Sequence, residues 1–406
     1  MKKNFNLVAL FLSMSHCFSF SQGTSYSGPY SVSSPIVWNG INNATISMLE
    51  IVNPSGHCIS LSNCSNITIQ NCKLGPSKKE GVNLCNCTNI TVINCSMDSI
   101  ETGVYADGCT GIKVIYNDVK NVQGPMPRGQ MVQFNNVSGA GNSISYNVGE
   151  NTPGQSFPED EISIFMSNGT ATDPIQVIGN WIRGGGPSTS GGGIMTGDNG
   201  GSYIVVQDNI LVDPGQYGIS VSGGNHITVS NNRIYARKQS FCNVGLYAWN
   251  QSPTACSAIT ISNNQINYTK SDGTLNDMWN AGNCGTINGW GTNVYNANLS
   301  SLILPTKIIG RVQGTTTGMM ATPLTSRETK IYPNPASDHI TIETSPNIYN
   351  GKVILYNIKG QRLIEQFLEA GNMDLDTHNL PGGAYVVKIL SDNQQPEEKK
   401  LIIGNR

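Results

Sequence analysis

Residues 63–73 read Asn63-Cys64-Ser65-Asn66-Ile67-Thr68-Ile69-Gln70-Asn71-Cys72-Lys73, and residues 86–96 repeat them as Asn86-Cys87-Thr88-Asn89-Ile90-Thr91-Val92-Ile93-Asn94-Cys95-Ser96. The offset is 23 residues. A period of about 20–30 residues built from short β-branched runs is typical of a solenoid. Each unit is too small to bury its own apolar face, so we predict that the units stack and share one core.

Looser copies of the same short strand occur elsewhere in the chain. They begin at Ala44, Gly108, Ile175, Ile204, Ile227 and Ile259. Each alternates apolar and polar residues, which predicts a strand with one face inward and one outward. Most end in Asn, which tolerates a left-handed turn. We expect its side-chain amide to bond the Asn of the next coil.

This repeat resembles that of the right-handed parallel β-helix proteins, and the resemblance covers residues 31–309. It implies an all-β chain whose main domain, residues 22–310, is a right-handed single-stranded parallel β-helix. Residues 299–309 are expected to pair with its last coil. The fold hosts many activities and therefore implies no function by itself.

The C-terminal part of the chain has a different composition. Residues 311–328 lack a run of large apolar side chains and predict a linker. Residues 329–406 predict a small β-sandwich and carry three motifs: Tyr332-Pro333-Asn334-Pro335, Gly383-Ala384-Tyr385-Val386-Val387 and Lys399-Lys400-Leu401-Ile402. Together these resemble the C-terminal sorting domain of the type IX secretion system of Bacteroidetes. The resemblance implies the type IX secretion machinery as a partner; a carbohydrate-binding sandwich is the alternative.

The N-terminus and the composition also point to export. Residues 1–21 predict a signal peptide, with Lys2 and Lys3 before an apolar run and Ser19-Phe20-Ser21 at the cleavage site. The alternative is a membrane anchor, but the apolar run is too short to span a bilayer. Charged residues make up 12% and the net charge is −2, which argues against nucleic-acid binding. We expect a monomer that is secreted or held at the cell surface.

Cysteines recur at the repeat period, as Cys64, Cys87 and Cys109 do. This spacing favours small apolar core residues over zinc ligands. An exported protein can also form disulfides. Cys242 has two candidate partners, Cys256 and Cys284, and the sequence leaves the pairing open.

A second strand in each coil precedes the Asn-ended one. Its alternation predicts an outward column made of Ser60, Asn83, Tyr105, Gln133, Ser163, Met195, Ser220 and Tyr247. A slip of one residue would turn this column inward. Aromatic rings stack on sugars, and amides or carboxylates bond hydroxyls. We therefore predict a polysaccharide-binding strip made of Tyr105, Asp107, Gln133, Asn135, Asp198, Tyr247 and Trp249. The alternative is a merely solvated sheet.

The coils lengthen in the middle of the domain, where the outward-strand starts at Met131, Glu161 and Gly193 follow steps of 28, 30 and 32 residues. The additional residues must form loops, and functional groups concentrate on loops. One loop ends in the trio Glu159, Asp160 and Glu161. We expect Glu159 and Glu161 to share a face. The trio has three interpretations: a Ca²⁺ site, an acid and base for glycoside hydrolysis, or a solvated turn.

Basic residues near the same loops are the candidates for proton abstraction and charge neutralisation. They are Arg128, Arg183 and Lys238, and each has a surface cation as its alternative. A uronate lyase needs a neutraliser for the carboxylate and a base whose pKa is lowered. From the sequence, β-elimination of an acidic polysaccharide is the first hypothesis. A glycoside hydrolase using paired carboxylates is the second, and a non-catalytic glycan-binding or adhesin protein is the third.

Overall fold

The computed structural model describes residues 28–310 and, within 330–404, all but 344–350, 358–360, 369–371 and 392–393. The predicted signal peptide (1–21) and linker (311–328) lie outside the described residues. The contacts divide the chain into two compact units, Met1–Gln313 and Gly314–Arg406. Each unit is described by itself.

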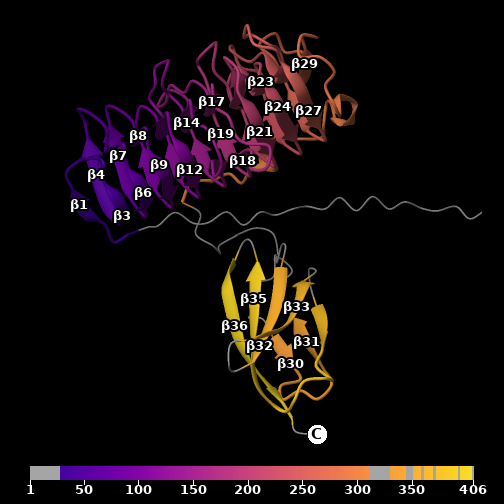
Figure 1. Ribbon diagram of the computed structural model, residues 1–406. Coiled ribbons are helices and arrows are strands. Elements are labelled where there is room, and N and C mark those ends of the chain that lie inside the picture. Colours follow the sequence, from indigo (N-terminus) through magenta and orange to yellow (C-terminus); the bar gives the residue numbers. More distant parts are fainter. Residues whose placement is uncertain are drawn as a thin grey trace, which may run out of the picture. The chain divides into compact units, whose positions relative to one another are not determined.

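The first unit is a parallel β-helix with three sheets, and each full coil gives one strand to each sheet (Figure 1). Sheet 1 contains β1 (Ser31–Ser33), β4 (Leu49–Asn53), β7 (Lys73–Ser77), β10 (Ser96–Asp98), β13 (Asp118–Lys120), β16 (Val148–Glu150), β19 (Trp181–Arg183), β22 (Ile210–Val212), β25 (Arg233–Ala236) and β28 (Gln265–Tyr268). Sheet 2 contains β2 (Ile36–Asn39), β5 (Ile59–Ser62), β8 (Val82–Cys85), β11 (Val104–Asp107), β14 (Val132–Asn135), β17 (Ile162–Phe165), β20 (Ile194–Asp198), β23 (Tyr217–Val221), β26 (Val244–Ala248) and β29 (Met278–Asn280). Sheet 3 contains β3 (Asn42–Ser47), β6 (Ser65–Gln70), β9 (Thr88–Ile93), β12 (Thr110–Ile115), β15 (Ser143–Ser145), β18 (Ile175–Ile178), β21 (Ser202–Gln207), β24 (Asn225–Ser230) and β27 (Ser257–Ser262).

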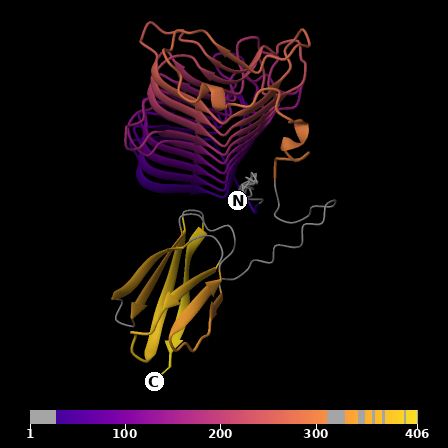
Figure 2. The same cartoon turned by 90° about the vertical axis from the view of Figure 1, so that its right-hand side faces the viewer.

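The two copies of the repeat lie on one another, as the sequence predicts. In sheet 3, Ile67 pairs with Ile90 and Ile69 with Val92, and all four side chains are buried. The periodic cysteines fill the core between coils: Cys64, Cys87 and Cys109 are each about 1% exposed. Figure 2 shows the coils stacked one on the next. Apolar side chains from all three sheets form one buried cluster. Stacking therefore supplies the core that no single coil could form.

A ladder of buried asparagines runs along the β-helix after the sheet 3 strands. It consists of Asn117, Asn147, Asn180, Asn209, Asn232, Asn264 and Asn293. At each step the Nδ2 of one Asn donates to the Oδ1 of the next, at 2.9 Å between Asn180 and Asn209. The same amide nitrogens donate to backbone carbonyls, so the buried polar groups are satisfied. The predicted bonding between successive asparagines is confirmed.

The end of the first unit differs from the prediction. Residues 299–309 do not pair with the last coil; they return along sheet 1, where Leu304 and Ile308 pack with Val148, Ile210 and Val212. Two short 3₁₀ helices, η1 (Trp290–Thr292) and η2 (Ser301–Ile303), lie in this closing region. The physical reason is burial of apolar surface. This segment covers apolar side chains on the outer face of sheet 1 that short polar turns would leave exposed.

The second unit is a β-sandwich, as predicted. One antiparallel sheet contains β30 (Lys330–Tyr332), β31 (His339–Glu343) and β34 (Asn372–Asp376). The other contains β32 (Gly351–Asn357), β33 (Arg362–Leu368), β35 (Gly383–Ser391) and β36 (Gln394–Ile403). Ile340 and Leu375 from the first sheet share one core with Leu355 and Val387 from the second. Across the described residues of both units, no helix is long and apolar enough to cross a membrane.

Candidate functional site

The outward column of sheet 2 follows the predicted register. Neighbouring strands pair Tyr105 with Gln133, Gln133 with Ser163, and Ser163 with Met195. The column continues through Ser220 and Tyr247. Period-two alternation therefore selects the correct face, and residues far apart in the chain form one continuous strip.

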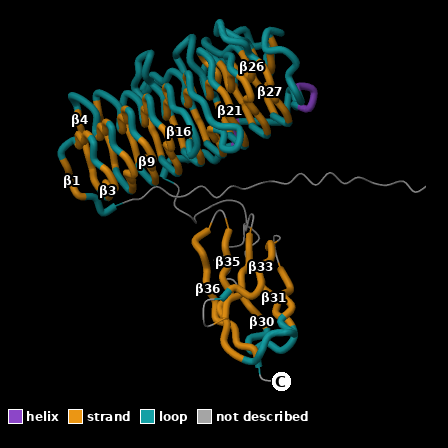
Figure 3. Tube along the Cα trace, in the orientation of Figure 1, coloured by secondary structure: helices purple, strands orange, loops and turns teal. Residues whose placement is uncertain are grey.

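A groove of about 530 Å³ lies over the middle of this column. Its lining residues are Tyr105, Met126, Pro127, Arg128, Gln130, Gln133, Asn135, Glu159, Asp160, Ser163, Phe165, Ser190, Met195, Asp198, Tyr217, Ser222, Tyr247 and Gln251. The sheet forms the floor. The loops that precede β14, β17 and β20 form a wall; Figure 3 shows such loops in teal between the orange strands.

The three predicted loops support one another. The N–H of Glu159 donates to the carbonyl of Gly129 in the first loop at 3.0 Å. Ser190 Oγ, from the third loop, donates to Glu159 Oε1 at 2.5 Å. The wall is thus cross-linked by hydrogen bonds, which holds the Glu159 carboxylate at the groove.

Asp160 is the most strongly perturbed carboxyl that faces the groove. Burial raises its pKa to about 7; the charges of Glu159 and Asp198 add to this rise, while Tyr217 and the N–H of Gly192 oppose it. Tyr217 donates its hydroxyl to Asp160 Oδ1, and Gly192 N–H donates to the same oxygen at 3.1 Å. A Cβ on Gly192 would lie 2.6 Å from the Tyr217 ring, so only glycine permits this approach. Oδ2 is therefore the oxygen left to carry a proton.

Asp198 reaches the same groove because β20 contains a bulge. Ile164 pairs with Thr196, but Phe165 pairs with Asp198, so Gly197 is an additional residue. Gly197 has φ +70°, and a Cβ there would meet the carbonyl oxygen of Gly223 at 2.1 Å. Without the bulge, alternation would turn Asp198 inward; with it, the carboxylate faces out. Burial raises the pKa of Asp198 as well.

The predicted arrangement of the acidic trio is wrong. Glu159 and Asp160 line the groove, whereas Glu161 is fully buried in the core. Glu161 Oε1 accepts a 2.7 Å bond from Asn151, Oε2 has no hydrogen-bond partner, and burial raises its pKa well above the usual range. The trio therefore offers no common position to a Ca²⁺ ion. Among the described residues, no three His, Cys, Asp or Glu side chains group closely enough to hold a metal.

Arg128 is held in the groove by three contacts. Its Nε lies 3.0 Å from Glu80 Oε1, its Nη1 donates to Gln133 Oε1 at 3.3 Å, and its guanidinium lies 3.9 Å above the Tyr105 ring. His57 Nδ1 lies 2.6 Å from the other Glu80 oxygen. Burial would raise the pKa of Glu80, but His57 and Arg128 together lower it to about 2. Glu80 thus stays ionised, and its negative charge compensates the positive charge of Arg128.

Two predicted basic residues lie elsewhere. Arg183 donates to the carbonyls of Thr306, Leu304 and Pro305, so it fixes the returning segment on sheet 1 instead of reaching the groove. Lys238 is exposed and does not line the groove; it lies beside Gly273. Neither position supports a catalytic role in this groove.

The remaining predicted binding residues lie along the strip. Tyr105, Gln133, Asn135 and Tyr247 line the groove. Asp107 lies next to it and accepts a 2.6 Å bond from Asn135 Nδ2. Trp249 is 43% exposed beyond the groove, beside Trp279.

Sequence reasoning missed Tyr217, Glu80 and His57. Tyr217 lies one residue before the glycine that begins the aligned strand, so its reach to Asp160 has no local signal. Glu80 lies 48 residues before its partner Arg128. The one sequence signal for Glu80 is an acidic residue directly before Gly81, the glycine that begins the aligned strand of its coil.

Comparison with known families agrees with the two-unit architecture. Residues 34–210 match the family model for a right-handed beta helix region, and residues 330–404 match that for a secretion system C-terminal sorting domain. This chain therefore contains a right-handed β-helix region and a secretion sorting domain. The sorting domain indicates type IX export to the cell surface or into the medium. No curated protein matches the sequence.

Several solved structures are similar to this chain at low identity, each with a TM-score below 0.5. The catalytic domain of a GH87 alpha-1,3-glucanase, solved with nigerose, is 14% identical with a TM-score of 0.46; the match covers 66% of this chain and 55% of that domain. An alginate lyase from Paenibacillus sp. str. FPU-7 is 14% identical with a TM-score of 0.38, covering 64% of this chain and 91% of the lyase. Tailspike protein 2 of Escherichia coli O157:H7 bacteriophage CAB120 is 11% identical with a TM-score of 0.42. The match covers 91% of this chain and 64% of the tailspike. These likenesses concern the fold alone.

Proposed function

We propose that this protein is a glycoside hydrolase that acts on a polysaccharide bound in the groove of sheet 2. One observation carries the proposal: Asp160, with a pKa of about 7, faces a groove that also contains Asp198 and Glu159. Glycoside hydrolysis needs a carboxyl that stays protonated beside one that stays ionised. Such a pair arises when different environments move the pKa values of two neighbouring carboxyls apart.

Each carboxyl has a distinct role in the reaction. The Asp160 Oδ2 proton passes to the glycosidic oxygen as the bond from that oxygen to the anomeric carbon breaks. Asp198, at the bulge of β20, supplies the second carboxylate, which either attacks the anomeric carbon or removes a proton from the attacking water. Glu159 adds negative charge that stabilises the developing oxocarbenium ion. Whether Asp198 acts as nucleophile or as base, one water is consumed for each bond cleaved and a new reducing end forms.

The charge of the groove favours hydrolysis over the β-elimination preferred from sequence. Arg128 is the only Arg or Lys among the lining residues, and Glu80 matches its charge. Three carboxyls line the same space. A uronate polymer would bring further negative charge into it, which costs free energy. A neutral or weakly charged glycan fits this groove better.

Elimination remains the second candidate because of one feature. Arg128 lies over Tyr105 at 3.9 Å, which places a cation and a phenol together at the groove. Arg128 could neutralise the carboxylate of a uronate, and the Tyr105 phenolate, once its proton is lost to solvent, could accept the C5 proton. This candidate makes a different product and is separable by experiment.

The test is product analysis in H₂¹⁸O with the full chain and a panel of neutral and uronate polysaccharides. Hydrolysis predicts ¹⁸O at each new reducing end and no absorbance from new double bonds. Unlabelled products with such absorbance would establish elimination instead. Binding without any product from a polymer would leave the adhesin hypothesis as the remaining one.

A further inference from the structure

The outward column of sheet 2 does not end with the groove. After Tyr247 the next paired residue is Trp279 on β29, which is 45% exposed. Trp249, just beyond β26, is 43% exposed. Two half-exposed tryptophans at one end of a sheet are unusual, because a monomer normally buries most of such large apolar surfaces.

The rings form one connected group. The Trp249 and Trp279 centroids are 5.7 Å apart at 69°, and the Tyr247 and Trp279 centroids are 6.5 Å apart at 49°. Tyr217, which bonds Asp160, packs edge-on against Tyr247 at 5.3 Å. The aromatic platform, Tyr247 with Trp249 and Trp279, is thus joined to the proposed acid through Tyr217.

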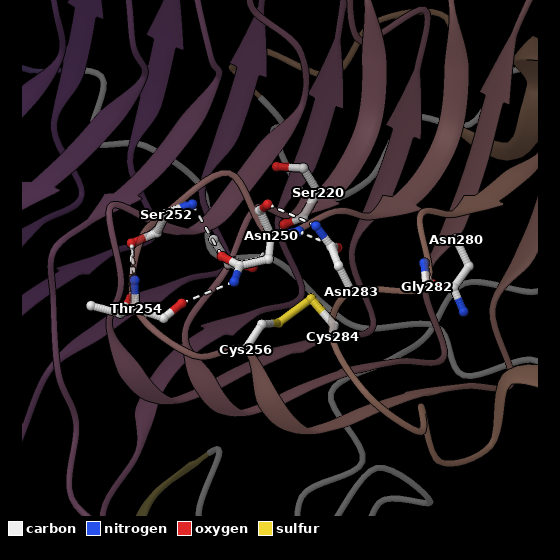
Figure 4. The surroundings of a disulfide bond; sticks show 10 residues. Ser220, Asn250, Ser252, Thr254, Cys256, Asn280, Gly282, Asn283 and Cys284 are labelled. Carbon is white, nitrogen blue, oxygen red and sulfur yellow. Dashed lines mark hydrogen bonds between the residues drawn. A yellow bond between two sulfur atoms is a disulfide. The ribbon is translucent and has the colours of Figure 1, made fainter.

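The loops that follow β26 and β29, the strands of Tyr247 and Trp279, are fastened to each other, as Figure 4 shows. Asn250 N–H donates to Asn283 Oδ1 at 2.9 Å, and Asn283 Nδ2 donates back to the Asn250 carbonyl at 3.0 Å. The disulfide Cys256–Cys284 joins the same two loops. The expected pairing of Cys242 with one of these two cysteines is therefore wrong: Cys256 and Cys284 pair with each other, and Cys242 is a buried free thiol. Loops fastened in this way hold the rings in place before a ligand arrives, which lowers the entropy cost of binding.

The platform is continuous with the groove. Tyr247 and Gln251 line the groove, and Gln251 Nε2 donates to the Tyr247 hydroxyl at 3.3 Å. Strands in a sheet are about 4.8 Å apart, so the three steps from β20 to β29 span roughly 14 Å. On the other side of the carboxyls the column continues to Gln133 and Tyr105.

We propose that the aromatic platform is a distal subsite that stacks on a pyranose ring of the same glycan whose bond is cleaved at Asp160. This inference rests on the proposed function and extends it to the mode of action. Because contacts flank the carboxyls on both sides, the protein binds the interior of a polymer and cuts within it. The apolar faces of pyranose rings match exposed tryptophan, and Trp279 on β29, roughly 14 Å from β20, lies too far from Asp198 for a single ring to reach both.

The test compares the full chain with the double variant Trp249→Ala/Trp279→Ala in affinity electrophoresis. The probes are soluble β-glucan, dextran, xylan and galactomannan cast in the gel. The matched control is Tyr295→Ala, since Tyr295 is similarly exposed (46%) but lies outside the groove lining. We expect at least tenfold weaker retardation for the double variant on the polymer that the wild type binds, and unchanged retardation for the control.

Cleavage measurements separate this inference from the proposed function. On the bound polymer, the double variant should show a KM raised about tenfold, while cleavage of a di- or trisaccharide of that polymer stays unchanged. Normal polymer binding and KM in the double variant would overturn the subsite, even if hydrolysis is established. Binding that depends on the tryptophans but yields no product would keep the subsite and refute the hydrolase. No wild-type retardation by any probe would overturn the subsite.

Discussion

The early and middle coils of the β-helix share one register and differ in what they carry. At β5 and β8 the outward column holds Ser60 and Asn83, and neighbouring positions are 23 residues apart. At β14, β17 and β20 the same column holds Gln133, Ser163 and Met195, with long loops preceding each strand. The stacking physics is the same in both regions. The chemistry is concentrated where the repeat is interrupted.

The comparison also shows where polar groups are satisfied and where they are not. In the asparagine ladder, which passes through the same middle coils, each buried Asn donates to the next and to a carbonyl. In the interrupted coils, Asp160 and Glu161 are buried carboxyls whose pKa values are raised. Burial of such groups costs stability, which natural proteins tolerate mainly at functional sites.

The largest expected effect follows from removing the proposed acid in the interrupted region. Asp160→Asn should lower kcat on the cleaved polysaccharide by about 10²–10⁴-fold, because a general acid contributes this range. The control is Asp98→Asn, an exposed carboxylate on sheet 1 whose nearest ion-pair contact is Lys120 at 3.9 Å. Initial rates of reducing-end release measure the effect. Equal activity in both variants would refute the assignment of Asp160.

The asparagine ladder, which also runs through the interrupted coils, should respond in stability instead. Asn180→Ala removes a ladder member and leaves buried groups of Asn147 and Asn209 without partners, so we expect about 1–3 kcal/mol lower unfolding free energy. The exposed Asn168→Ala should change it by less than about 0.5 kcal/mol. Denaturant titration checks both. Equal effects would mean that the ladder does not stabilise the stack.

Tyr217→Phe should change the pH profile of activity. The Tyr217 hydroxyl bonds Asp160 and opposes the rise of its pKa, so its loss raises that pKa further. Activity that needs protonated Asp160 falls as pH rises through its pKa. The alkaline limb of kcat/KM should therefore move up by about one pH unit, since a bond to a charged group is worth roughly 1.5–3 kcal/mol. A limb that stays in place would separate Tyr217 from the acid.

The smallest expected effect concerns Glu161→Gln. Burial raises the folded-state pKa of Glu161, so the folded state binds more protons than the unfolded state above about pH 4.3. This group therefore lowers stability as pH rises. The variant should match the wild type near pH 4 and become more stable relative to it toward pH 8. Unfolding free energies at several pH values test this; a pH-independent difference would contradict it.

The sequence predicts what is local and periodic. Alternation placed Tyr105, Gln133 and Tyr247 on one face, because a strand repeats every two residues and the core must be apolar. It failed at Glu161, since the loop before β17 does not alternate and the carboxyl enters the core. It also failed at Arg183, whose partners lie more than 100 residues later in the returning segment. Side-chain contacts between coils, such as that of Glu80 with Arg128, do not recur at the repeat period, so the sequence pattern does not predict them.

The most direct test is a crystal structure of the Asp160→Asn full chain with an oligosaccharide that the wild type cleaves. The account predicts a glycan chain crossing sheet 2, with a glycosidic oxygen within hydrogen-bond distance of the side chain at position 160 and the anomeric carbon facing Asp198. A glycan bound on another face, or one whose glycosidic oxygens all lie away from position 160, would contradict it.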